Sequence, residues 1–443
     1  MNDIEKLPEG THTIAIGFGD LNGIMRGKRI PATNWGNVCK NGTAICLSAL
    51  VYDMTCDVWD TPIANNDNGY PDMHIFPSTK PLALPWEPGV AISFARIEGM
   101  DHNPVSVDAR KVLERQVVRA KKLGYDIKVG TELEFFLLDP ETKKPKDKGI
   151  QVYSLERASE LEHVLGPIRR HLSECDIPIE QSNPEYASGQ VEVNIRYDDP
   201  LVSADRVIMF RSLVKQIAHQ KGYLATFMPK PILNESGSGF HCHYSLWKGK
   251  KNIFSEGGKF SQEGKYFIGG IQKRICESTI CGSMNVNGYR RKELYSFCPT
   301  NNTWGFDNRS TALRVIEGSD SSTRFEKRDA GADCNPYLRI ATDIASGLDG
   351  LEAKTEPSKV TVGDAYKDKK SPKLPDNISD AIRLAKGSKW LKEVLGDDML
   401  LLCVQQCERE LNFFSQQKSY CKTNNNFRLS NSSEKAKILF IRF

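Results

Sequence analysis

The chain has 443 residues, of which 39% are hydrophobic and 26% are charged, and this balance is that of a globular protein and excludes a disordered or fibrous one. Sixty Lys and Arg oppose 56 Asp and Glu, so the net charge of +4 is too small and too evenly spread to indicate a nucleic-acid partner. The longest strongly apolar run, residues 399–404, is far shorter than the ~20 residues that cross a bilayer. We therefore expect no nucleic-acid partner and no membrane partner.

The first residues, MNDIEKLPEG, have neither the basic start nor the apolar core of a secretory signal. The twelve cysteines are scattered through a long chain and form no CxxC pair, so a disulfide framework is not indicated. These two observations predict a cytoplasmic protein with reduced thiols.

The segment before residue 104 alternates short β-like runs with turns rich in Gly, Asn, Asp and Pro. The runs TIAIGF, TAICLSALVY and VAISFARI predict a small, mostly β domain over residues 1–104. At Val105 the pattern changes, because apolar residues recur at helical spacing as far as Leu123 and Gly124 follows as a stop signal. We place a domain boundary near residue 104.

Beyond this boundary, helical and strand patterns alternate, as in an α+β or α/β domain. The periodicity predicts a helix around 155–175, a strand at 190–196, a helix around 203–221 and a strand over LATFMP. We expect this domain to extend over residues 105–415.

The C-terminal part begins with an exposed loop at 352–376, which is rich in Lys, Pro, Asp and Ser. Helical patterns follow at 378–395 and 398–414. From Gln416 the composition is polar without a clear period, which predicts a poorly ordered tail over residues 416–443.

The first segment with chemical potential is GTELEFFLLD, at residues 130–139. Glu132 and Glu134 lie two apart on one strand face, where their carboxylates repel each other unless a cation lies between them. A solvated strand face would also explain the pair.

The strand GQVEVNIRYDD adds Glu192 on its polar face, and Glu185 stands seven residues earlier in a turn-rich stretch. A surface hairpin would give the same alternation.

In the segment KPILNESGSGFHCHYSLW, the flexible GSG leads into a strand on which His241, His243 and Ser245 share one face. Buried core histidines usually occur singly, so two at strand spacing favour contact with a ligand or phosphate. Zinc is not favoured, because no cysteine is placed to complete a tetrahedral set with both histidines.

The segment SSTRFEKRDAGADCNPY places Arg324, Glu326 and Arg328 on one strand face, so two guanidinium groups flank a carboxylate. Upstream are further arginines, namely Arg291, Arg309 and Arg314. A solvated face is the alternative, but the alternation with apolar and small residues favours a pocket for an anionic substrate.

These segments together supply five carboxylates and one imidazole, which suit two hard divalent cations such as Mg²⁺ or Mn²⁺: Glu132, Glu134, Glu185, Glu192, Glu326 and His241. With arginines nearby, the substrates that fit are a nucleoside triphosphate and a carboxylate. The sequence has no GxxxxGK[ST] segment and no kinase-type Gly-rich loop, so neither a P-loop enzyme nor a protein kinase is indicated.

In this order, the segments GTELEFF, NPEYASGQVEVN, KPILNESGSGFHCHYS, NGYRR, DNRSTALRV and RFEKRDAGADCNPYL resemble glutamine synthetase, over about residues 11–415. The resemblance implies an α+β fold with an N-terminal β-grasp domain and a catalytic domain with a curved antiparallel sheet. It also implies a homo-oligomer, a dodecamer of two rings, whose active sites lie between neighbouring subunits. The implied substrates are ATP, glutamate and an amine or ammonia, with two Mg²⁺ or Mn²⁺ ions in each site.

The resemblance further implies a role for each matching residue. One metal would be held by Glu134, Glu185 and Glu192, and the metal at the ATP phosphates by Glu132, His241 and Glu326. ATP contacts would come from Glu180, His243, Ser245, Arg314 and Arg324. Arg291 and Arg328 would bind the glutamate carboxylates, Arg309 would neutralise the transferring phosphate, and the backbone at Gly237 would accept from the glutamate amino group. Asp53, in the segment from Tyr52–Asp53 to Asp72–Met73, would complete a neighbour's site.

The loop after Arg291 departs from the family. Ammonia-using members place a glutamate there that covers the site and accepts a proton from ammonium, whereas this chain has Phe297 at that position, with Glu293 four residues earlier. Together with DLNGIMRGK, this loop resembles the branch that joins glutamate to putrescine, other polyamines or ethanolamine. The alternatives are a glutamine synthetase that uses ammonia and a catalytically silent structural relative. The silent relative is disfavoured, since it has no physical need to keep mutually repelling carboxylates.

Overall fold

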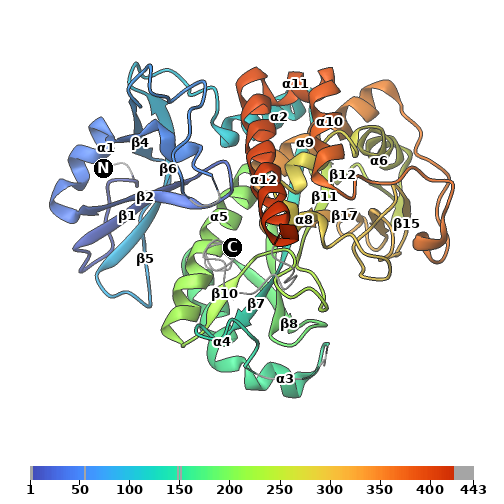
Figure 1. The fold of residues 1–443 in the computed structure, drawn as a ribbon, viewed down its shortest axis with the longest axis horizontal. Coiled ribbons are helices and arrows are strands. Elements are labelled where there is room, and N and C mark those ends of the chain that lie inside the picture. The colour runs from blue at the N-terminus through green and yellow to red at the C-terminus, as the bar shows by residue number, and fades with distance from the viewer. Residues whose placement is uncertain (1–2, 54–55, 147–148, 150–151, 424–443) are drawn as a thin grey trace.

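A computed structural model describes residues 3–53, 56–146, 149 and 152–423. In Figure 1 a small N-terminal sheet, drawn in blue, forms one side of the molecule, and a larger sheet with most of the helices forms the rest. The expected mixture of helices and strands, with an N-terminal strand region before a larger α/β region, is therefore confirmed.

The N-terminal sheet has six strands in the order β2-β1-β6-β4-β3, with β5 paired to β6. Their bounds are Thr13–Gly19, Met25–Pro31, Thr43–Cys46, Asp72–Pro77, Leu82–Ala83 and Val90–Gly99 for β1 to β6. Strands β1 and β6 run parallel, and the other pairs are antiparallel. The run TAICLSALVY is a strand only as far as Cys46, because Leu47–Leu50 turn into a 3₁₀ helix, η2, whose buried residues pack into the core.

The larger sheet has nine strands in the order β15-β16-β17-β11-β7-β9-β8, with β10 on β7 and β12 on β11. The bounds are β7 Asp126–Leu138, β8 Ile179–Pro184, β9 Gln190–Asp198, β10 Leu224–Thr226, β11 Gly239–Lys248, β12 Lys251–Asn252, β15 Trp304–Phe306, β16 Leu313–Ile316 and β17 Arg324–Gly331. Two short strands, β13 (Ser255–Glu256) and β14 (Lys259–Phe260), pair separately. The sheet is antiparallel as expected except for β15 and β16, which run parallel.

Several helices pack against strands of this sheet, whereas the first helix packs against β4 of the N-terminal sheet. Their bounds are α1 Trp35–Asn41, α2 Ala109–Lys122, α3 Leu155–Glu160, α4 Glu162–Glu174, α5 Pro200–Gln220, α6 Gln262–Arg274, α7 Thr279–Gly282, α8 Val286–Tyr289, α9 Pro336–Ala353, α10 Ile378–Gly387, α11 Lys389–Leu395 and α12 Asp397–Thr423, with 3₁₀ turns η1 at Ala32–Asn34 and η3 at Ala365–Lys367. Helix α12 continues past Gln416, so the expected boundary of the tail falls inside it. Residues 424–443 of that tail lie outside the described residues.

Helix α9 fixes the orientation of strand β17 from behind. The Nζ atom of Lys327 lies 2.5 Å from a carboxylate oxygen of Asp343, and Asp329 pairs with Arg339 at 2.5 Å, all four side chains being buried. Because side chains alternate along a strand, Arg324, Glu326 and Arg328 face the opposite side. The ion pairs between β17 and α9 therefore stabilise the orientation in which Arg324, Glu326 and Arg328 face the site.

Every cysteine whose side chain is described is free, in agreement with the expected reduced thiols. Within the described residues, no helix is both long enough and apolar enough to span a bilayer.

Candidate active site

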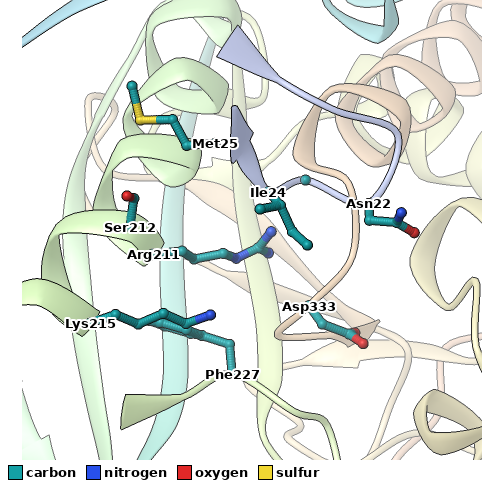
Figure 2. A pocket seen from close by; sticks show the side chains of 9 residues that line it. Asn22, Ile24, Met25, Arg211, Ser212, Lys215, Phe227 and Asp333 are labelled. Atoms are coloured by element: carbon teal, nitrogen blue, oxygen red, sulfur yellow. The ribbon is translucent and has the colours of Figure 1, made fainter. Parts of the chain in front are cut away.

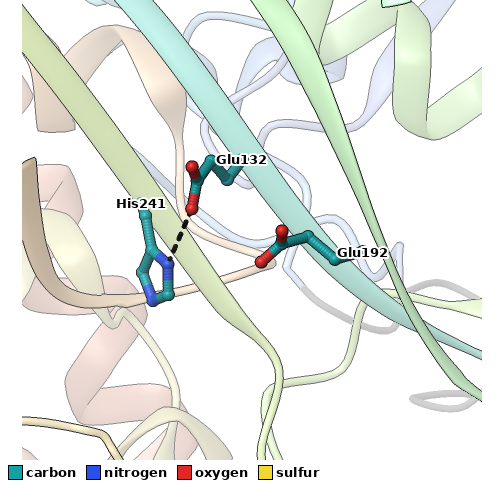
Figure 3. Close-up of side chains that lie close together, drawn as sticks. All are labelled: Glu132, Glu192 and His241. Atoms are coloured by element: carbon teal, nitrogen blue, oxygen red, sulfur yellow. Dashed lines mark hydrogen bonds and ion pairs between the residues drawn. The ribbon is translucent and has the colours of Figure 1, made fainter. Parts of the chain in front are cut away.

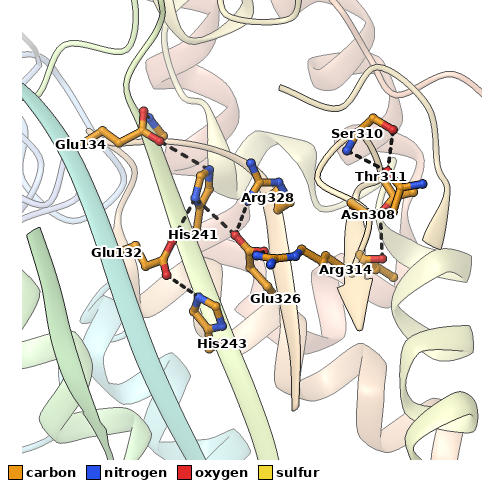
Figure 4. A network of polar contacts seen from close by, with 12 residues as sticks. Glu132, Glu134, His241, His243, Asn308, Ser310, Thr311, Arg314, Glu326 and Arg328 are labelled. Carbon is orange, nitrogen blue, oxygen red and sulfur yellow. Dashed lines mark hydrogen bonds and ion pairs between the residues drawn. The ribbon is translucent and has the colours of Figure 1, made fainter. Parts of the chain in front are cut away.

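Four neighbouring strands, β17, β11, β7 and β9, present their charged side chains on one face of the larger sheet; Figure 4 shows those of β7, β11 and β17, and Figure 3 shows Glu192 of β9. Register brings them together: Glu132 of β7 lies opposite His241 of β11, and Glu134 lies opposite Glu192 of β9. The intervening residues of β11, Cys242 and Tyr244, are buried on the other face. Alternation within each strand puts its charged residues on one face, and pairing between the strands then places these residues side by side in one cluster.

One half of the cluster is balanced by positive groups. Glu132 contacts His243 Nε2 at 2.8 Å and His241 Nδ1 at 3.4 Å, and the same His241 atom lies 3.4 Å from Glu326 (Figure 4). Glu326 is fully buried and pairs with both Arg328 and, at 3.1 Å, Arg314. Burial alone would raise the pKa of Glu326, but Arg328 and the histidines lower it to about 2. Glu326 is therefore a permanent anion.

The other half, formed by Glu134, Glu185 and Glu192, has an excess of negative charge. In the described part of the chain, neither Glu185 nor Glu192 forms an ion pair with a lysine or an arginine. Burial and the negative charge of Glu134 raise the pKa of Glu185 to about 7. Burial and three neighbouring carboxylates raise the pKa of Glu192 to about 9. Without a cation, protonation relieves the repulsion, and a bound cation would supply positive charge in place of those protons.

The donor atoms fit divalent cations. One oxygen of Glu132, one oxygen of Glu192 and a ring nitrogen of His241 lie within 4.8 Å of one another (Figure 3), as do the corresponding atoms of Glu132, His243 and Glu326. Carboxylate-dominated sites of this kind suit Mg²⁺ or Mn²⁺. Neither set is the expected one. The first joins Glu192, expected at the other cation, to Glu132 and His241, and the second has His243, expected at ATP, in place of His241.

A cavity of about 460 Å³ opens beside the balanced half. Four of the five residues expected at ATP line it together with Glu132: Glu180, His243, Ser245 and Arg324. Arg314 does not line it, because its guanidinium is engaged by Glu326 and, at 2.6 Å, by Asp307. Tyr197 and Trp247 also line this cavity although they were not expected there, and their aromatic faces suit stacking on a base.

The residues expected at glutamate form a continuous set next to Glu134. Arg291 is buried and donates to the carbonyl oxygen of Ala330 at 2.7 Å. A Cβ atom at Gly237 would lie 2.7 Å from the Arg291 side chain, so only glycine admits this approach. The amide of Gln190 donates to the Gly237 carbonyl oxygen at 3.1 Å and to Glu134 at 3.3 Å. This bridging role of Gln190 was missed, although its place on the polar face of β9 indicated it.

Arg309 lines an open hollow of about 560 Å³ with aromatic walls, and its charge opposes the rise in the pKa of Glu185 that burial and Glu134 cause. Phe297 lines this hollow with 53% of its side chain exposed, beside Tyr295 and Tyr366, whose ring centroids are 5.3 Å apart. Glu293 is held elsewhere, because its carboxylate pairs with the buried Lys230 at 2.9 Å. Aromatic side chains therefore form much of the wall beside Arg309. The two carboxylates that also line the hollow, Asp307 and Asp364, are paired with Arg314 and Lys367.

Asp53 lines neither the ATP-side cavity nor this hollow. It is buried, accepts from the backbone N–H of Asp57 at 3.0 Å and lies 3.3 Å from Arg409 of α12. Within one chain, Asp53 therefore lies outside both the ATP-side cavity and the hollow beside Arg309.

Cation binding to this site is expected to release protons. Without a cation, the raised pKa values leave Glu192 (about 9) largely protonated and Glu185 (about 7) about half protonated near neutral pH, and a bound cation must displace those protons. The apparent affinity for Mn²⁺ should therefore rise between about pH 6 and about pH 9, by up to about tenfold per pH unit for each proton displaced. Titration calorimetry in two buffers of different ionisation enthalpy measures the release. Glu192→Gln should reduce it, and an affinity that does not change with pH would contradict the account.

Comparison with known proteins places this site in context. The family model described as glutamine synthetase, catalytic domain, matches residues 106–425. A glutamate–isopropylamine ligase of a Pseudomonas species is 33% identical over 392 residues (85% of this chain and 85% of that protein). A γ-glutamylethanolamide synthetase of Streptomyces coelicolor is 32% identical over 418 residues (91% and 89%), and a glutamine synthetase of Methanosarcina mazei is 34% identical over 414 residues (88% and 89%). The solved structure of GmaS with ADP has a TM-score of 0.83 at 27% identity and covers 92% of this chain and 95% of that one.

Proposed function

The chain belongs to the glutamine synthetase family, and on that premise we propose that it joins glutamate to an amine at the expense of ATP, giving a γ-glutamylamide. The observation that supports this most directly is the shared strand face, where a buried cluster of carboxylates lies between arginines and a cavity of about 460 Å³. The carboxylates would hold two Mg²⁺ or Mn²⁺ ions, and the arginines would bind the anionic substrates. When bound, such cations neutralise charge on the transferring phosphoryl group.

The reaction has two steps. An oxygen of the glutamate γ-carboxylate attacks the γ-phosphorus of ATP, the bond to the bridging oxygen breaks, and ADP leaves. The amine nitrogen then attacks the acyl carbon and loses a proton, and the C–O bond breaks so that phosphate leaves with the former carboxylate oxygen. We propose that Arg291 and Arg328 orient glutamate, that Gly237 accepts from its amino group, and that Arg309 stabilises charge on the phosphoryl group.

The residues of this site also support a position for ATP and for each of the two cations. We propose that ATP occupies the cavity lined by Glu180, His243, Ser245 and Arg324, while Arg314 acts by holding Glu326 in place. Glu134, Glu185 and Glu192 would hold the cation nearer to glutamate, and Glu132, His241 and Glu326 the cation nearer to ATP. We further propose a catalytic unit over residues 105–415 and a dodecamer of two rings in which Asp53 serves a neighbouring site.

The amine, not ammonia, is the proposed acceptor because of the hollow beside Arg309. An ammonium ion must lose a proton before it attacks, and a free carboxylate nearby would assist, but Phe297 offers none and Glu293 is paired with Lys230. The two carboxylates that line the hollow, Asp307 and Asp364, are paired with Arg314 and Lys367. The aromatic wall instead suits an alkyl group, whose burial stabilises by ~0.8 kcal/mol per CH₂. The runner-up is a true glutamine synthetase, which would require Glu293 to leave Lys230 and face the acceptor.

We predict that kcat/KM for isopropylamine, ethanolamine or putrescine exceeds that for ammonia. Phe297→Glu should shift the ratio toward ammonia by about tenfold, equivalent to ~1.4 kcal/mol in the transition state. Leu294→Glu is the matched control, since it adds the same charge to the same exposed loop outside the lining of the hollow. A wild-type preference for ammonia of tenfold or more would overturn the assignment of the acceptor without affecting the ligase chemistry.

A further inference from the structure

The loop around Asp53, which we define as residues 51–53 and 56–60, is attached to the rest of the chain from two sides. The first attachment is the turn between β1 and β2, where Asn22 Nδ2 donates to the carbonyl oxygen of the residue before Asp53 at 2.7 Å. Figure 2 shows Asn22 on this turn, at the edge of a cavity of about 220 Å³ that lies between the turn and α5. The turn is itself fixed, because the side chain of Asn335, which caps α9, donates to two of its carbonyl oxygens at 3.0 and 3.1 Å.

The second attachment is Arg409 of the C-terminal helix α12. Its Nη2 atom lies 3.3 Å from Oδ2 of Asp53 and 3.8 Å from a carboxylate oxygen of Asp57. Its guanidinium carbon lies 5.2 Å from the centre of the Trp59 ring, in a cation–π contact. The indole N–H of Trp59 in turn donates to the carbonyl oxygen of Val51 at 2.7 Å. One side chain of α12 therefore contacts the loop around Asp53 near both of its ends.

These contacts fix the orientation of the Asp53 carboxylate. Its Oδ1 atom accepts from the backbone N–H of Asp57 at 3.0 Å, and its Oδ2 atom faces Arg409. Since each oxygen of this planar group has its own partner, the plane of the carboxylate cannot turn without breaking one contact. With 39% of its side chain exposed, Arg409 contributes little to the free energy of unfolding through such an ion pair. Its main effect is therefore on geometry.

Arg409 has no direct place in the site on its own chain. Among the described residues it lines neither the ATP-side cavity nor the hollow beside Arg309. We propose that Arg409 is a positioning residue, which holds Asp53 of its own chain in the orientation that the neighbouring subunit's site requires. This role rests on the proposed function, in which Asp53 serves a neighbouring site. The C-terminal helix of one subunit then affects a reaction on the next.

Arg409→Ala should lower ATP-dependent phosphate release by at least about tenfold, because a displacement of about 1 Å in a reacting site can cost about a hundredfold. The thermal midpoint should hardly change. Arg409→Lys keeps the charge but loses the flat guanidinium over Trp59, so it should restore only part of the activity. Lys386→Ala is the matched control, since it removes an exposed cation that pairs at 2.5 Å with Glu408, the neighbour of Arg409 on α12, and it should leave turnover unchanged. Full activity in folded Arg409→Ala would overturn the proposal.

Mixed oligomers show on which subunit Arg409 acts. When Arg409→Ala chains assemble at random with equal amounts of Glu326→Gln chains, about a quarter of the sites combine Glu326 of one subunit with an intact Asp53 loop of its neighbour. Activity should then exceed that of either parent oligomer. A mixture of Arg409→Ala chains with Asp53→Ala chains should show no such gain, because the loop is defective in every site. Arg409→Gln replaces Arg409→Ala in each mixture if the alanine variant lowers the thermal midpoint.

The opposite results are equally distinct. If Arg409 supported only the fold of its own chain, dilution with inactive Glu326→Gln chains would lower the activity, and that result would overturn the proposal. A parallel mixture of Asp53→Ala with Glu326→Gln chains tests the shared site by itself. Recovery in this mixture alone would refute the role of Arg409, whereas failure of both mixtures would reject the shared sites and the role of Arg409 with them.

Discussion

Replacing Glu326 by glutamine should lower ATP-dependent phosphate release by about a thousandfold. Glu326 is fully buried, contacts His241 and two arginines, and its pKa of about 2 keeps it charged at every working pH. The amide has nearly the same volume, so the change removes one negative charge from the proposed cation site without creating a cavity. Binding of the cation on the ATP side should be weakened together with turnover.

The control for this variant is Glu317→Gln. Glu317 lies just after β16, near the site in sequence, but its carboxylate pairs with the exposed Lys259 at 3.0 Å. Steady-state phosphate release and the thermal midpoint should be measured for both variants. Near-normal turnover in a folded Glu326→Gln protein would refute the ligand assignment, and Glu134→Ala should behave like Glu326→Gln.

Mixing two inactive variants should recover activity if sites are shared between subunits. A site is intact when one subunit contributes Glu326 and its neighbour contributes Asp53. Random co-assembly of Asp53→Ala chains with Glu326→Gln chains should therefore restore about a quarter of the sites. Within one chain Asp53 lies beside Arg409 and lines neither the ATP-side cavity nor the hollow beside Arg309, which is why a neighbour's site is proposed for it.

The matched control mixes Glu134→Ala chains with Glu326→Gln chains. Both residues lie on the same sheet of one chain, so no neighbour can complete either site and the mixture should remain inactive. Activity should be measured after co-expression with two affinity tags that select mixed oligomers. Failure of the first mixture to recover activity, or full activity in a dilute and verified monomer, would contradict shared sites.

The polar strand faces could be predicted from sequence because a two-residue period is local. Glu132 with Glu134, His241 with His243, and Arg324 with Glu326 each share a face by spacing alone. Which strand lies beside which depends on long-range pairing, so the placement of Glu132 opposite His241 came only from the structure. The resemblance to the family supplied the order of the segments, not their register.

Element boundaries departed from prediction where a local signal was overlooked. Helix α5 begins at Pro200 and not near 203, because Asp199 caps it by accepting from the N–H of Leu201 and proline suits the first turn. The helix expected over 155–175 is divided at Leu161, a buried residue between α3 and α4. The parallel pairing of β15 with β16 has no local signature at all.

The aromatic hollow shows a different limit of sequence reasoning. Phe297 was expected near the acceptor from its place in the loop, but Tyr366 comes from a segment about seventy residues away and joins it only through folding. Likewise, the pairing of Glu293 with Lys230 joins two loops that no spacing rule connects. Contacts between irregular segments depend on how the whole molecule packs. The sequence shows no repeating spacing of residues from which such contacts can be predicted.

We propose that ATP phosphorylates the glutamate γ-carboxylate before the amine attacks it. Glutamate labelled with ¹⁸O in the γ-carboxylate tests this directly, when turned over with ATP, Mg²⁺ and isopropylamine and analysed by mass spectrometry of the released phosphate. Each γ-glutamylamide formed should be matched by one phosphate carrying one ¹⁸O atom. Phosphate without ¹⁸O, released at the same rate with or without glutamate, would contradict it.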